Sequence, residues 1–187
     1  MLTKIVQILP AICYNSYEIR LFRAAYVLAF HGFLRVGEFS LSVGNSVHSI
    51  LQVSDVQFEL NFSSVCIIIR SSKSDQHSRG VTVAINKIGG ILCPVGCLND
   101  FLLVRGKSDG PLFIHLACSG GRALTRYQFS SVLEKALNTL GIQGRFKAHS
   151  YRIGAATAAF EAGCSPEEWK QVAGNLRCTN HIFVVQS

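Results

Sequence analysis

Apolar residues recur at helical spacing near the start of the chain. Between residues 16 and 32 they lie three or four positions apart, which predicts an amphipathic helix. Its buried face would carry Leu21, Phe22, Ala25, Leu28 and Ala29. We expect Gly32 to end or bend this helix. In the next segment, residues 33–39, Arg35 and Glu38 are three positions apart, so a helical turn would bring both to one face.

The pattern then changes to one typical of strands. Residues 65–70 and 81–85 are rich in β-branched side chains, and the polar stretch 71–80 separates them. This arrangement predicts an antiparallel hairpin, with Lys73 near its tip or at the end of its first strand.

Helical signals dominate the remainder. Residues 94–105 are predicted to form a helix, followed by an extended connection over 110–114. Thr125 and Gln128 have the spacing of a capping box, which predicts a helix that ends at Gly141. Further helices are expected from His149 or Ser150 to residue 163, and between residues 165 and 174. The fold class is therefore α+β, mainly helical with one small antiparallel sheet, in a single domain over 1–187.

Composition narrows the protein class. The longest strongly apolar stretch, residues 24–34, is too short to cross a bilayer. The apolar residues 5–13 are not followed by a signal-peptide cleavage site. Seven scattered cysteines indicate reduced thiols in the nucleus or cytoplasm, and a chain that is not secreted. Cys93 and Cys97 have no second ligand pair at zinc spacing, so packing is favoured for them. We expect no metal and no cofactor.

Charge indicates a polyanionic partner. The chain has 18 Lys and Arg against 11 Asp and Glu, a net charge of +7, and its isoelectric point is near 9.2. Nucleic acid is the partner class that this balance favours.

Four residues have the chemistry for attack on a DNA phosphodiester. Arg35 and Arg152 could clamp the nonbridging oxygens, because a guanidinium donates two parallel hydrogen bonds and stays charged. Lys73 and His149 could transfer protons, including to the leaving 5′-oxygen. This hypothesis requires the four side chains to converge. Lys87 and Lys107 remain alternatives to Lys73.

These segments resemble the catalytic domain of tyrosine recombinases, the phage-integrase family. Residues 32–39 resemble the first catalytic-arginine motif, with Glu38 as its supporting acid, and residues 149–156 resemble the His-x-x-Arg motif. Residues 173–176 fall where the family has Gly followed by His or Trp. The sequence of residues 21–38 is especially similar to that of recombinases from eukaryotic Crypton and DIRS mobile elements. The resemblance implies the family's fold, double-stranded DNA as partner, possible homo-oligomers on DNA, and DNA recombination and integration.

Two positions depart from the family. Leu176 replaces the His or Trp, and Val184 or Val185 replaces the nucleophilic tyrosine that forms the 3′-phosphotyrosyl link in relatives. No tyrosine follows Arg152, and His181 is the nearest alternative nucleophile. We therefore expect phosphate binding without cleavage.

The ends of the sequence raise further expectations. The family's N-terminal core-binding domain is expected to be absent, and the uncharged apolar end to be a truncation. A reading frame that continues to a tyrosine is one alternative. Another is a non-catalytic DNA-binding or protein-interaction module derived from a mobile element.

Overall fold

The computed structural model describes residues 1–70, 81–106, 108–117, 120–142, 154 and 157. The helices are α1 (Leu2–Ile12), α2 (Ser16–His31), α3 (Val36–Phe39), α4 (Pro94–Arg105) and α5 (Arg126–Thr139), with 3₁₀ turns η1 (Val47–Ser49) and η2 (Val53–Asp55). The strands are β1 (Val56–Phe58), β2 (Ser64–Ile69), β3 (Val81–Asn86), β4 (Ile114–Ala117) and β5 (Gly120–Ala123). Of the helices predicted after residue 148, only Gly154 and Thr157 fall within the described residues, and both are helical.

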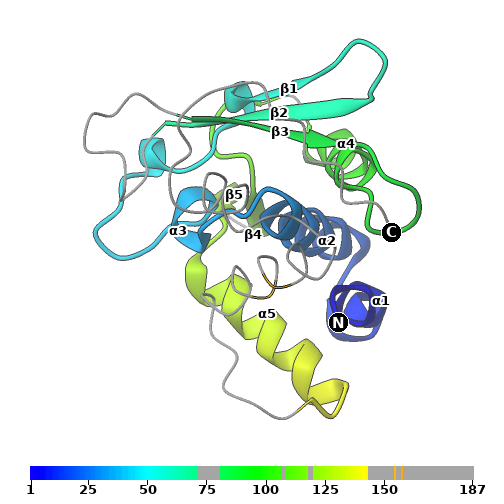
Figure 1. Cartoon of the computed structure of the whole chain (residues 1–187). Coiled ribbons are helices and arrows are strands. Elements are labelled where there is room, and N and C mark those ends of the chain that lie inside the picture. Colours follow the sequence, from blue (N-terminus) through cyan, green and yellow to red (C-terminus); the bar gives the residue numbers. More distant parts are fainter. Residues whose placement is uncertain (71–80, 107, 118–119, 143–153, 155–156, 158–187) are drawn as a thin grey trace.

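Helix α2 is the centre of the described fold. The sheet β1–β2–β3 lies on one side of α2 and α4, and helices α1 and α5 lie on the other (Figure 1). Helix α2 packs against both α4 and α1, and α1 also packs against α5. The architecture is α+β and mainly helical, as predicted. No helix within the described residues is long and apolar enough to span a membrane.

Helix α2 ends in a way that prepares the next turn. Its N-cap residue, Asn15, accepts a hydrogen bond from the Glu18 amide. At the other end, the Phe33 amide donates to Phe30 O and the Leu34 amide donates to Ala29 O, the pattern of a Schellman motif. Phe33 takes the left-handed position at φ 51°, where glycine is usual.

The role of Gly32 in this motif is steric. Its own φ is −88°, so the backbone does not require glycine. A Cβ at position 32 would lie only 3.0 Å from both the Ile85 side chain and Leu28 O. Glycine therefore allows the close approach of α2 to β3. The predicted end of the helix at this residue is confirmed.

The predicted hairpin is also confirmed. Strands β2 and β3 pair antiparallel from Ser64↔Asn86 to Ile69↔Val81. Buried and partly exposed positions alternate along β2, as expected for a sheet with one face on the core. Strand β1 was not predicted, because three residues are too few to show a period of two.

The second half of the described fold matches its predicted helices more closely than its strands. Helix α4 has the expected bounds, and α5 begins with the Thr125–Gln128 capping box. The expectation of one sheet was incomplete. Ile114 belongs to the strand pair β4–β5, not to an extended connection. Helix α1 was not predicted either, because Pro10 interrupts the sequence that forms it.

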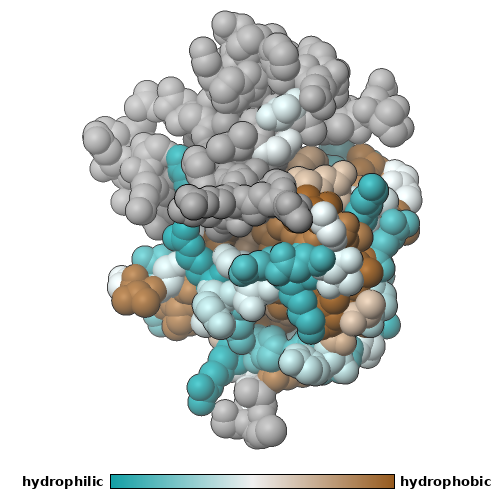
Figure 2. Space-filling view, turned by 90° about the horizontal axis from the view of Figure 1, so that it is seen from below, coloured by the Kyte–Doolittle hydropathy of each residue, from teal (hydrophilic) through white to brown (hydrophobic). Residues whose placement is uncertain are grey.

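The surface mixes polar and apolar side chains. Figure 2 shows the molecule from below, with hydrophilic side chains scattered over the described surface and an apolar area between them. Exposed large apolar residues occur on several elements, including Leu103 on α4 and Tyr127 on α5.

Candidate functional site

Arg35 sits at the start of α3, directly after the Schellman motif. It is the N-cap residue of this one-turn helix, with an extended backbone. The Arg35 backbone amide donates a hydrogen bond to Glu38 Oε2 at 2.8 Å, and Arg35 Nη1 donates to Glu38 Oε1 at 3.3 Å. The predicted pairing of Arg35 with Glu38 is therefore present, with one carboxylate holding both ends of the arginine.

The pair is asymmetric in its exposure. The Arg35 side chain is 33% exposed, whereas that of Glu38 is 9% exposed. The carboxylate thus lies beneath the guanidinium and limits the directions in which it can point. A guanidinium held in this way loses less conformational entropy when it binds an oxyanion. The arrangement suits binding of a phosphate oxygen.

The core fixes the turn that carries this pair. Phe39 is fully buried, and its ring centroid lies 5.8 Å from that of Phe113 and 5.2 Å from that of Phe129. The hydroxyl of buried Ser40 donates to Val36 O at 2.6 Å. Because both residues are anchored, α3 cannot rotate without disrupting the aromatic core.

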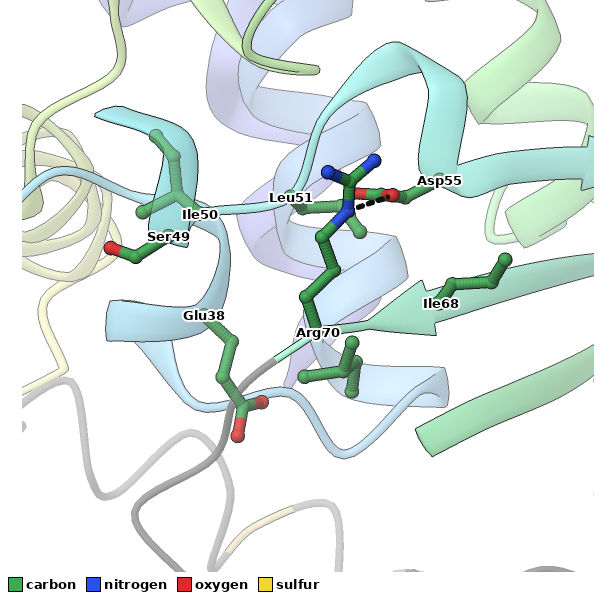
Figure 3. Close-up of a pocket in the computed structure, with 8 residues that line it drawn as sticks. Glu38, Ser49, Ile50, Leu51, Asp55, Ile68 and Arg70 are labelled. Carbon is green, nitrogen blue, oxygen red and sulfur yellow. Dashed lines mark hydrogen bonds and ion pairs between the residues drawn. The ribbon is translucent and has the colours of Figure 1, made fainter. Parts of the chain in front are cut away.

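Glu38 also lines a shallow pocket against the sheet. The lining residues come from α3, the η1–η2 segment and the end of β2: Glu38, Ser49, Ile50, Leu51, Asp55, Ile68, Ile69 and Arg70 (Figure 3). The space within it is about 170 Å³ with open solvent included, so it encloses almost no space of its own. The pocket is thus a junction between elements, not a cofactor cavity.

An ion pair that sequence reasoning missed crosses this junction. Arg70 Nε donates to Asp55 Oδ1 at 2.6 Å, and Arg70 Nη2 donates to the Ser54 hydroxyl at 3.1 Å. In Figure 3 the Arg70 guanidinium turns toward Asp55, while the Glu38 carboxylate extends away from it. The spacing of Gln52 and Asp55 is that of a capping box, which signals the cap at this turn but not the partner Arg70.

Most of the predicted site lies outside the described residues. This holds for Lys73, His149 and Arg152, for the departures Leu176, Val184 and Val185, and for the alternatives His181 and Lys107. The convergence of Arg35 with Lys73, His149 and Arg152 therefore stays a prediction. The segment 71–80, which contains Lys73, follows Arg70 directly in the chain, and Arg70 lines the same pocket as Glu38.

Lys87 can be placed. It follows β3, and its amide donates to Ser63 O at 2.7 Å. That position is the opposite end of the hairpin from Arg70, seven residues or about 23 Å away along the strand. Its position disfavours Lys87 as a substitute for Lys73.

The cysteine pair has structural contacts. Cys93 is the N-cap of α4, where its Sγ accepts from the Gly96 amide, and the Cys97 thiol donates to Ile91 O at 3.3 Å. Burial raises the pKa of Cys97 to about 11, so the thiol stays protonated at neutral pH. Within the described ranges, no group of three or more His, Cys, Asp or Glu side chains is arranged to hold a metal ion.

Comparison with known proteins places this fold. No family model matches the sequence, and no curated protein matches it. Solved structures do match. XerH site-specific recombinase bound to difH substrate, in its pre-cleavage complex, has a TM-score of 0.67 at 17% identity, over 92% of this chain and 44% of that chain. Its post-cleavage complex with palindromic difH has a TM-score of 0.66 at 18% identity, with the same coverage.

XerA recombinase is similar as well, with a TM-score of 0.59 at 20% identity, over 92% of this chain and 52% of that chain. The chain thus has the fold of the tyrosine-recombinase catalytic core and spans about half the length of the solved structures it matches.

Proposed function

We propose that this chain binds duplex DNA through a phosphate site of the tyrosine-recombinase type. The observation that carries the proposal is the anchored Arg35, held by Glu38 through both its backbone and its side chain, on a fold shared with recombinases. Arg35 and Arg152 donate to the nonbridging phosphate oxygens. Lys73 and His149 complete the site as the residues that transfer protons.

We further propose that this 187-residue chain does not cleave DNA. The chemistry of the family needs a tyrosine oxygen in line with the phosphate, and valine at 184 and 185 has no nucleophilic atom. Leucine at 176 cannot donate the hydrogen bond of a His or Trp. The chain then retains the cationic site without the covalent step.

The same departures favour a non-catalytic role for a domain derived from a mobile element. The proposal extends to one domain over residues 1–187 and to action in the nucleus. The similarity of residues 21–38 to Crypton and DIRS recombinases supports this origin.

The binding claim is tested with gel shifts on duplex DNA. Arg35→Ala is expected to weaken binding about tenfold or more, because a charge-assisted hydrogen bond to phosphate is lost. Arg20 is an exposed arginine on α2, so Arg20→Ala is the matched control for the loss of one charge. Equal losses in the two variants would leave only nonspecific basic attraction, the behaviour of a defunct fragment.

The inactivity claim is tested with a nicked suicide duplex. We expect no protein–DNA adduct that resists denaturant. Any such adduct would disprove inactivity. An adduct that the His181→Ala substitution abolishes would in addition identify His181 as the nucleophile.

A further inference from the structure

The side chain of Asp55 is nearly inaccessible, at 3% exposure. Its Oδ2 accepts the Gln52 backbone amide at 2.9 Å, and its Oδ1 accepts Arg70 Nε at 2.6 Å. A buried carboxylate is destabilising unless it is paired and hydrogen-bonded. Arg70 is therefore needed at this position, although its own side chain is 53% exposed.

The Asp55–Arg70 ion pair joins the end of β2 to the segment that is hydrogen-bonded to the Arg35–Glu38 turn. Arg70 directly follows β2. Asp55 ends η2, in a segment whose Leu51 amide donates to Glu38 O at 2.8 Å. The side chain of Gln52 ties the same segment internally, by donating to Val47 O and Ile50 O. A short chain of contacts thus runs from β2 through Asp55 and Leu51 to Glu38, and from Glu38 to Arg35.

We infer that Asp55 and Arg70 form a positioning pair that fixes the Arg35–Glu38 turn against the end of β2, and so sets where Arg35 meets DNA. This inference rests on the proposed function. It also assigns Arg70 a role distinct from that of a phosphate ligand, because the Nε edge and Nη2 of its guanidinium are engaged by Asp55 and Ser54.

The sign of one substitution separates positioning from charge. Asp55→Asn removes a negative charge, so long-range attraction alone predicts tighter DNA binding. If Arg70 were itself a phosphate ligand, its release from Asp55 would also tighten binding. Positioning predicts the opposite, a loss of about threefold to tenfold, because the neutral amide no longer holds the guanidinium.

Matched controls come from a second ion pair. Arg23 on α2 lies 4.0 Å from Asp100 on α4, and both side chains are partly exposed. Asp100→Asn makes the same charge change as Asp55→Asn and is expected to leave DNA binding unchanged or slightly tighter. Arg23→Met is the corresponding control for Arg70→Met.

The experiment measures duplex affinity for the single and double variants of Asp55 and Arg70. Both single variants are expected to weaken DNA binding. The double variant Asp55→Asn/Arg70→Met should have an affinity within about twofold of the weaker single variant, because the same ion pair is lost in each. Arg35→Ala should also cost less in the Arg70→Met background. Thermal unfolding, followed by circular dichroism, establishes that each variant is folded at the assay temperature. Arg70→Met remains usable if Asp55→Asn does not fold.

The outcomes separate the two proposals. Tighter binding by folded Asp55→Asn, or strictly additive losses in the double variants, would overturn the positioning role. In the Arg70→Met background, an undiminished effect of Arg35→Ala would do the same. An Arg35→Ala variant that binds like the unsubstituted chain would instead overturn the proposed function.

Discussion

Among the residues that the structure describes, three acidic side chains share one arrangement. Glu18, Glu38 and Asp55 each lie near a helix start, and each accepts a backbone amide three or four residues earlier. Each places its second oxygen against a basic side chain, which is His115, Arg35 and Arg70 respectively. A local cap thus also fixes a side chain, which for Glu18 and Asp55 comes from another element. The sequence predicted the Arg35–Glu38 contact from spacing alone, but the Glu18–His115 and Asp55–Arg70 contacts span long separations that no local pattern reveals.

His31 provides a pH prediction at this scale. Burial lowers its pKa to about 4, although a hydrogen bond with the Leu92 backbone opposes the shift. The unfolded chain takes up the proton near pH 6.5, whereas the folded protein does so only near pH 4. The contribution of His31 to stability is therefore fully present above pH 6.5 and is lost as the pH falls toward 4.

The expected slope is about 1.4 kcal/mol per pH unit within that window. Urea unfolding of the unsubstituted chain and of His31→Leu at several pH values would measure it. The difference between the two free energies of unfolding should shrink between pH 6.5 and 4. A constant difference would show that His31 titrates normally in the folded state.

Arg105 provides a second prediction. It is 6% exposed, and it donates hydrogen bonds to the carbonyls of Gly106, Ser108, Pro111 and Leu112. Burial lowers its pKa, yet the hydrogen bonds stabilise the charged form. Arg105→Met leaves these carbonyls without their donors, and we expect a loss of about 3 kcal/mol in the free energy of unfolding. Arg20→Met, at an exposed position, should change it by less than about 0.5 kcal/mol.

At the scale of elements, local sequence signals predicted the elements whose conformation depends on nearby residues. The capping box of α5, the bounds of α4 and the β2–β3 hairpin follow from residues close in sequence. Helix α1 was missed because Pro10 is unfavourable within a helix, but it lies in the last turn, and the apolar face of α1 is buried against its neighbours. The glycine-rich strand β5 has low intrinsic strand preference, so pairing with β4 decides its conformation.

The cap of α5 supplies the prediction for an element. Thr125 Oγ1 accepts the Gln128 amide at 3.1 Å, and Gln128 Oε1 accepts the Thr125 amide at 2.9 Å. Thr125→Ala is expected to lower the free energy of unfolding by about 1 kcal/mol. Thr3, exposed within α1, is the control, because alanine there favours the helix. Similar losses in both variants, measured by urea unfolding, would argue against a capping role.

At the scale of the whole molecule, fold class was predictable and the complete site was not. Hydrophobic periodicity specified a mainly helical α+β protein, and the solved recombinase structures share its fold. The predicted site depends on bringing Arg35 together with His149 and Arg152, more than one hundred positions later in the sequence. Periodicity carries no information about such distances. Only Arg35 and Glu38 of the predicted set fall within the described residues.

The net charge of +7 gives a prediction for the molecule as a whole. Affinity for duplex DNA should fall linearly with salt on logarithmic axes, as counterions are released from phosphates. Arg35→Ala should make this slope shallower by about 1, because one phosphate contact is lost. Fluorescence anisotropy over a salt series measures it. Unchanged slopes would mean that Arg35 does not contact a phosphate.

Because Arg35 is held by its own turn, it should resist substitution when a gene is no longer selected for strand cleavage. Glu38 holds the arginine from three residues away, and Phe39 anchors the same turn in the aromatic core. A gene relieved of selection for strand cleavage, but still selected for a folded product, would keep this half of the site as a by-product of folding. In such a lineage the nucleophile would be substituted long before the anchored arginine.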